Sequence, residues 1–118
     1  MEQLISLFFL ARDIAHKEHL RTDSYARHMA LGSFYDDIIG HADSIAEAYM
    51  GSYGVLKDFA IQGSNQPVEI IKELERQVNW IDENRYKVCS KDDTPIQNLI
   101  DGAVETYLST LYKLKRFK

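Results

Sequence analysis

Three of the four histidines in this chain lie in one short stretch, "HKEHLRTDSYARH", as His16, His19 and His28. Two carboxylates follow further along the chain, Asp43 and Glu47, spaced four residues apart. That spacing places both carboxylates on one face of a helix, on neighbouring turns. Imidazole nitrogens and carboxylate oxygens together form a ligand set suited to iron, zinc or manganese. These residue types therefore raise the possibility of a metal site, provided that the fold brings them together.

The composition describes one ordinary globular domain covering residues 1–118. The chain is 45% hydrophobic and 27% charged, and its net charge of −4 gives no global sign of nucleic-acid binding. The single cysteine, Cys89, excludes an intrachain disulfide. Because the N-terminus also lacks the pattern of a signal peptide, we expect a cytoplasmic protein. No run approaches the roughly 20 apolar residues of a membrane span, so we expect no membrane partner.

Four amphipathic segments with polar caps predict an all-α fold, a four-helix bundle. The first covers residues 2 to about 20, and the second runs from a cap at "TDS" to Gly51. The third and fourth are expected to begin at Pro67, after "SNQ", and at Pro95, after "DDT". The stripes at helical spacing are Leu4, Leu7, Phe8, Ala11, Ile14 and Ala15; Leu31, Tyr35, Ile38, Ala42, Ile45 and Tyr49; Val68, Ile71, Leu74, Val78 and Ile81; and Ile96, Leu99, Ile100, Ala103, Val104, Tyr107, Leu108, Leu111 and Leu114.

The lengths of the connections predict how the helices are arranged. The first two helices meet at a tight turn near Thr22, and "KDDT" joins the last two, so each pair is expected to be an antiparallel hairpin. About fifteen residues, "GSYGVLKDFAIQGSN", lie between the second and third helices. A connection of that length can run the full length of a bundle, as the single long crossover of ferritin-like bundles does. We therefore expect a ferritin-like helical bundle.

The heights of the candidate ligands argue against a site within one chain. His16 and His28 lie six residues before and after Thr22, so a hairpin places them at one level. Asp43 is fifteen residues beyond His28, roughly 22 Å along a straight helix. A twofold axis that packs helix two against its copy would instead bring His16 and His28 to the partner's Asp43 and Glu47.

A second apolar flank on the first helix favours such an oligomer. Ile5 and Phe9 fall well off the main stripe of that helix, and His16 lies on the same flank. A helix in a small monomer needs only one buried face, so a second one indicates packing against another subunit. His19 is expected to be a capping or surface residue at the helix end.

The spacing His16, eleven residues, His28, then Asp43, three residues, Glu47 resembles the ferroxidase signature of Dps-type miniferritins. The wording around "FYDDI" and "ADSIAE" is also similar to helix two of that family, over residues 9 to 51. The resemblance implies a homo-oligomer that binds iron at twofold interfaces, with zinc or manganese as substitutes. It implies oxidation and sequestration of Fe(II), a ferroxidase activity.

The chain departs from that pattern at two positions. Gly32 stands where the family has an acidic residue four after the second histidine, and Lys17 stands where the family has a tryptophan. Asp36, one turn beyond Gly32, is the candidate substitute ligand.

Two alternatives to an iron protein follow from the sequence. The first is a non-enzymatic ferritin-like bundle that acts as a protein-interaction module with a vestigial metal site. The second is nucleic-acid packaging through the C-terminal "KLKRFK". The structural interpretation of that basic run is that it stabilises the negative end of the helix dipole. Its cationic residues are Lys113, Lys115, Arg116 and Lys118.

Overall fold

The computed structural model describes residues 1–63 and 67–118, and within them it contains four α-helices and no strand. Helix α1 spans Glu2–Arg21, α2 spans Tyr25–Tyr53, α3 spans Ile70–Val88 and α4 spans Thr94–Arg116. The prediction of an all-helical bundle is confirmed. None of these helices is both long enough and apolar enough to span a lipid bilayer, over the residues that the structure describes.

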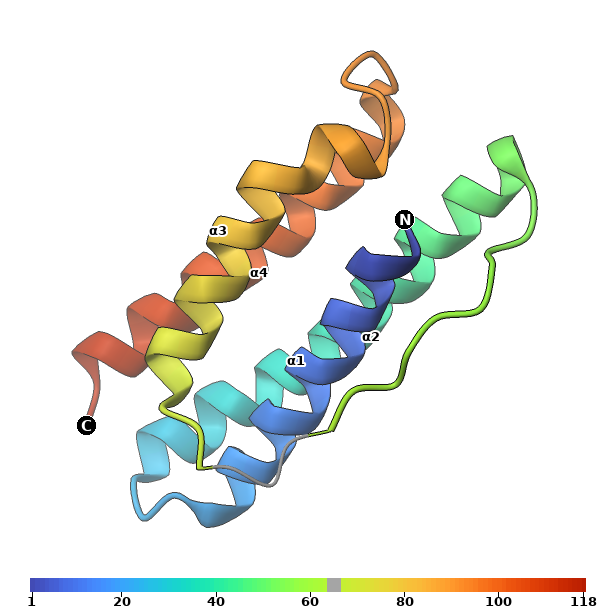
Figure 1. Cartoon of the computed structure of the whole chain (residues 1–118). Coiled ribbons are helices and arrows are strands. Elements are labelled where there is room, and N and C mark those ends of the chain that lie inside the picture. The colour runs from blue at the N-terminus through green and yellow to red at the C-terminus, as the bar shows by residue number, and fades with distance from the viewer. Residues whose placement is uncertain (64–66) are drawn as a thin grey trace.

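Two antiparallel hairpins, α1–α2 and α3–α4, lie side by side (Figure 1). Helix α1 packs against α2 and α3, and α4 packs against α2 and α3. After α2, residues 54–63 run back along the first hairpin, and α3 starts near the α1–α2 turn (Figure 1). The predicted short turns and the single long crossover are therefore confirmed.

The caps explain where the helices begin. Ser24 Oγ accepts a hydrogen bond from the Arg27 amide, which confirms the predicted cap of the second helix. Asp93 caps α4 in the same way, and Pro95 lies in its first turn, where a missing amide hydrogen costs nothing.

The predicted start of the third helix at Pro67 is wrong. Helix α3 begins at Ile70, because the Glu69 carboxylate accepts hydrogen bonds from the Ile71 and Lys72 amides and so satisfies the first turn. The residues of the proposed "SNQ" cap lie outside the described residues.

The core follows the predicted stripe of α1, all of whose residues are buried. Phe34 of α2 and Leu108 of α4 are the large side chains whose burial differs most clearly from the prediction. Phe34 is fully buried and lies edge-on to the Tyr107 ring, although it was not in the predicted stripe of α2. Leu108 was in the predicted stripe of α4, but 54% of it is exposed.

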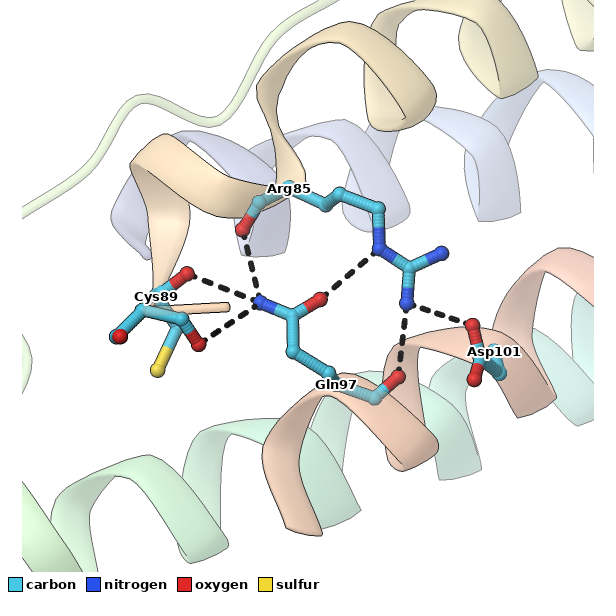
Figure 2. A network of polar contacts seen from close by, with 5 residues as sticks. Arg85, Cys89, Gln97 and Asp101 are labelled. Carbon is cyan, nitrogen blue, oxygen red and sulfur yellow. Dashed lines mark hydrogen bonds and ion pairs between the residues drawn. The ribbon is translucent and has the colours of Figure 1, made fainter. Parts of the chain in front are cut away.

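The α3–α4 hairpin is held shut by a network around Arg85 and the buried Gln97 (Figure 2). The Gln97 amide donates hydrogen bonds to the carbonyl oxygens of Arg85, Cys89 and Ser90, at 3.1, 2.9 and 3.4 Å. The Arg85 guanidinium donates back to the Gln97 side chain and carbonyl, both at 2.9 Å, and pairs with Asp101 at 2.6 Å. The carbonyls of Cys89 and Ser90, just beyond the C-terminal end of α3, thereby gain a side-chain donor, and the Arg85 carbonyl gains one besides the Cys89 amide.

Candidate functional site

The three clustered histidines lie where α1 ends and α2 begins. His16 and His19 belong to the last two turns of α1, and His28 to the first turn of α2. All three side chains are half-buried. The ring that lies against His28 is that of His19, one turn beyond His16 along α1.

His19 and His28 form a reciprocal pair across the hairpin, which we call the histidine clasp. Nδ1 of His19 donates a hydrogen bond to the carbonyl oxygen of His28 at 2.6 Å, and Nδ1 of His28 donates to the carbonyl oxygen of His19 at 2.8 Å. The two rings are stacked, with centroids 3.8 Å apart and planes 18° apart. Since the His19 carbonyl is in the last turn of α1, the clasp satisfies a group that has no partner in its own helix.

The clasp fixes the tautomer of both rings. A carbonyl oxygen only accepts hydrogen bonds, so each Nδ1 carries the hydrogen and each Nε2 points away from the clasp. A metal ion lies in the plane of the imidazole that binds it, about 2 Å from the nitrogen. The planes of two rings stacked 3.8 Å apart do not meet at that distance. One ion therefore cannot be chelated by both histidines of the clasp.

The His16 ring lies against a residue of α2 other than His28. Its ring stacks on Tyr35, with centroids 4.2 Å apart and planes 7° apart. The His19 ring lies between the other two histidines. Its centroid is 6.2 Å from that of His16 and 3.8 Å from that of His28. The structure thus brings His19, the residue expected to be a cap or surface side chain, into the centre of the cluster.

Gly32 provides the space for the His19 ring. A Cβ atom at position 32 would lie 3.0 Å from Cε1 and 3.1 Å from Nδ1 of His19. The ring has little freedom to move, because it is hydrogen-bonded on one edge and stacked on His28. Gly32 stands where the miniferritin pattern has an acidic ligand. The packing of the His19 ring therefore explains why a glycine occupies this position.

The acidic candidates lie apart from the histidines within one chain. Asp36, Asp43 and Glu47 are exposed on the outer face of α2. Among residues 1–63 and 67–118, no three or more His, Cys, Asp or Glu side chains form a group that could hold a metal ion. The site between subunits stays a prediction.

The second flank of α1 is covered by the chain itself. Ile5 is buried, and Phe9 lies edge-on to Phe59 of the crossover, with ring centroids 5.4 Å apart. Ser6 on the same helix donates a hydrogen bond to the Ala60 carbonyl at 2.7 Å. The crossover therefore accounts for this flank, and the flank no longer argues for a second subunit.

A surface that sequence reasoning missed lies around the C-terminal half of α4, and we call it the C-terminal surface. Four large apolar side chains there are at least half exposed: Met29 (51%), Leu108 (54%), Tyr112 (56%) and Phe117 (50%). Tyr112 and Phe117 contact edge to face, at 5.7 Å between centroids. The predicted nucleic-acid residues surround these side chains, and Lys115 pairs with Glu75 at 3.0 Å. The surface comprises Met29, Leu108, Tyr112 and Phe117 with Lys113, Lys115, Arg116 and Lys118.

Two hollows lie on either side of α4 within the C-terminal surface. One, of about 430 Å³, lies between α3 and α4 and includes Val78, Leu108 and Tyr112 in its lining. The other, of about 320 Å³, lies between α2 and α4 and is lined by Met29, Lys113, Phe117 and small residues of α2. The sequence signal was available in part, since Leu108 and Tyr112 share a face of α4 at a spacing of four.

Comparison with known proteins finds one phage protein and one protein family. It is 25% identical over 114 residues to an "uncharacterized 14.6 kDa protein in mobD-ri intergenic region" of Enterobacteria phage T4, covering 96% of this chain and 86% of that protein. No solved structure matches the chain. Residues 19–114 match a family of unknown function, DUF5856. That match spans the histidine clasp and most of the bundle, so the chain belongs to the DUF5856 family.

Proposed function

We propose that this protein is a non-enzymatic helical bundle that binds an acidic protein through its C-terminal surface. The observation that carries the proposal is the run of four half-exposed apolar side chains, Met29, Leu108, Tyr112 and Phe117. Monomeric proteins rarely leave contiguous large apolar groups in water, and such patches mark sites of interaction. Aromatic and Met side chains are also the types enriched in protein interfaces.

The shape and charge of the surface favour an acidic protein partner. The hollows beside α4 are lined by aliphatic groups such as Val78 and Met29, which suit the apolar anchors of a protein better than they suit phosphates. The cationic residues at the end of α4 would attract carboxylates at the rim of the interface. Nucleic acid remains the competing partner for those same cations.

We further propose that the bundle is a divergent relative of the ferritin-like superfamily. The support is its helix order, with two antiparallel hairpins joined by one long crossover that runs the length of the bundle. On this proposal the histidine clasp is a structural joint, in the place where the miniferritin signature has its metal ligands.

The test compares three forms of the protein as baits in a lysate of the cells that make it. One is the wild type, the second carries Leu108→Glu and Tyr112→Glu, and the third carries Tyr86→Glu as the control. Tyr86 is a comparable control because it is an aromatic residue on α3, 55% exposed and outside the C-terminal surface.

A supporting result is an acidic protein that the wild type and the control retain and the double variant loses, with the binding reproduced between purified proteins. Equal retention by all three forms would contradict the proposal. Tight binding of a fluorescent single-stranded DNA oligonucleotide, abolished by replacing Lys113 and Arg116, would instead assign the surface to nucleic acid.

A metal site between subunits is the second candidate, and the orientation of His28 favours it. Its Nδ1 is bonded to a backbone carbonyl, the arrangement that commonly orients a histidine so that Nε2 can bind a metal. In this proposal iron, or zinc or manganese in its place, is held by His16 and His28 with Asp43 and Glu47 of a second copy. Asp36, one turn beyond Gly32, is the further candidate ligand.

Equilibrium dialysis against Fe(II) without oxygen, together with light scattering, tests the second candidate. The expected result is one saturable site per chain in an oligomer, lost in His28→Ala and retained in His41→Ala. His41 is the matched control because its Nε2 is bonded to Thr106 Oγ1, between α2 and α4. Equal iron binding by both variants, or a monomer that binds no iron, would contradict it.

A further inference from the structure

A cavity of about 650 Å³ lies between the first half of α1, the crossover and α3. Its volume is in the range of sites that hold small molecules. It lies on a different part of the bundle from the histidine clasp and the C-terminal surface, and neither proposed function uses it. Its charged lining residues are Glu2, Lys57, Asp58 and Arg76.

Helix α3 presents a row of three side chains to this cavity. Arg76, Trp80 and Asn84 are spaced four residues apart, so they lie on one face of the helix, and all three line the cavity. The Asn84 side-chain amide donates a hydrogen bond to the Trp80 carbonyl at 2.8 Å, which fixes its orientation. The row therefore offers a cation, a flat aromatic face and an amide in sequence.

Hydrogen bonds connect Arg76, the cation of this row, to buried side chains of the bundle. The Arg76 guanidinium donates two hydrogen bonds to the Glu73 carboxylate, at 2.9 and 2.6 Å. Glu73 also accepts from Gln77 at 2.9 Å, and Gln77 accepts from the Tyr107 hydroxyl at 2.6 Å. Gln77 and Tyr107 are fully buried, so this chain of bonds anchors Arg76 to the interior of the bundle.

We propose that this cavity binds a nucleoside monophosphate. The flat base lies against Trp80, because an indole face stacks on any aromatic ring. The phosphate is held by Arg76, whose guanidinium has donors beyond the two that it gives to Glu73. The carboxylates of Glu2 and Asp58 accept hydrogen bonds from the sugar hydroxyls or from an exocyclic amine.

The test uses the fluorescence of Trp80, which is the only tryptophan in the chain. The whole protein is titrated with adenosine monophosphate and, separately, with adenosine. Saturable quenching by the monophosphate is expected, with adenosine binding roughly tenfold more weakly because it lacks the anion.

Two variants assign the phosphate to Arg76. Arg76→Gln is expected to weaken the binding of the monophosphate roughly tenfold and to leave that of adenosine unchanged. Arg12→Gln, which removes an exposed arginine of α1 outside the cavity, is the control and leaves both values unchanged. Circular dichroism shows whether both variants are folded.

Three results would overturn the proposal. They are the absence of saturable quenching at millimolar concentrations, equal affinity for adenosine and its monophosphate, and equal binding by folded Arg76→Gln and wild type. Arg76→Lys provides a second check, since it keeps the charge but loses the planar fork of donors. It is expected to bind with an affinity between those of wild type and Arg76→Gln.

Discussion

The α1–α2 and α3–α4 hairpins are each closed near the turn by side chains that bond to carbonyl oxygens at a helix end. In the first hairpin the closing groups are two stacked imidazoles, His19 and His28. In the second they are the buried Gln97 amide and the Arg85 guanidinium. The comparison shows that histidines, which are common in metal and catalytic sites, can close a hairpin in the same way as a glutamine and an arginine do.

The largest effect is expected in the second hairpin, from Gln97→Leu. The substitution leaves the Cys89 carbonyl without its side-chain donor and removes the Gln97 acceptor of the Arg85 guanidinium, while the Arg85 carbonyl keeps the Cys89 amide. We expect the free energy of unfolding to fall by about 3 kcal/mol, since each unsatisfied buried group costs 1–3 kcal/mol. Urea unfolding measures it, with the exposed neighbour Asn98→Ala as the control. A loss no larger than that of the control would show that the network does not hold the hairpin shut.

The next largest effect is expected from alanine at a glycine packed against the histidine clasp, compared with alanine at a glycine of the same helix that meets no other atom. Gly40→Ala, where a Cβ meets no atom within 4 Å, is expected to stabilise the protein by about 0.5–1 kcal/mol through helix propensity. Gly32→Ala is expected instead to destabilise it by about 1 kcal/mol, because the new methyl group displaces the His19 ring. Thermal or urea unfolding of both variants makes the comparison. Equal stabilisation by the two alanines would mean that His19 moves aside freely.

The two hairpins are also expected to differ in their response to acid. Asp93, the cap of α4, has its pKa lowered chiefly by the hydrogen bond from the Tyr53 hydroxyl, and also by that from the Ile96 amide. A carboxyl whose pKa is lower when folded stabilises the fold above its ordinary pKa of 3.8. That stability is lost as the pH falls through the folded value. The cap of α2, Ser24, has no charge to lose.

Asp93→Asn therefore reduces the decline of the melting temperature with falling pH, while Ser24→Ala leaves the slope of that decline unchanged. Melting curves followed by circular dichroism from neutral pH down to about pH 2 give both slopes. A decline in Asp93→Asn as steep as in the wild type would contradict the assignment of acid sensitivity to the second hairpin.

The smallest effect on stability is expected outside both hairpin joints, at the C-terminal surface. The double substitution Leu108→Glu and Tyr112→Glu changes groups that are more than half exposed. We expect the free energy of unfolding to change by less than about 0.5 kcal/mol for each substitution. Urea unfolding checks this. A large loss would mean that the surface supports the fold, and it would remove these side chains as candidates for binding a partner.

Much of the fold could be predicted from the sequence, because its signals are local. The apolar stripes, the polar segments "TDS" and "DDT" and the length of the crossover were sufficient to predict four helices, two hairpins and their connection. The start of α3 was predicted wrongly because Pro67 is a strong local signal, whereas the cap that decides it is a glutamate, Glu69.

The site was harder to predict, because it depends on how rings pack in three dimensions. Spacing predicted that His16 and His28 share a level, but it carried no information on stacking, so the central position of His19 was missed. For the same reason Gly32 was interpreted as a lost ligand. Periodicity also counted Leu108 as core, since a helical stripe continues across the boundary between a buried and an exposed face.

The most direct test of the histidine clasp is a double-mutant cycle between positions 19 and 32. The free energy of unfolding is measured for wild type, Gly32→Ala, His19→Ala and the double variant. The space beside Gly32 is filled by the His19 ring, so Gly32→Ala should destabilise the wild type. In the His19→Ala protein that space is free, and Gly32→Ala should stabilise it by about 0.5–1 kcal/mol through helix propensity. The same effect of Gly32→Ala in both backgrounds would contradict the account.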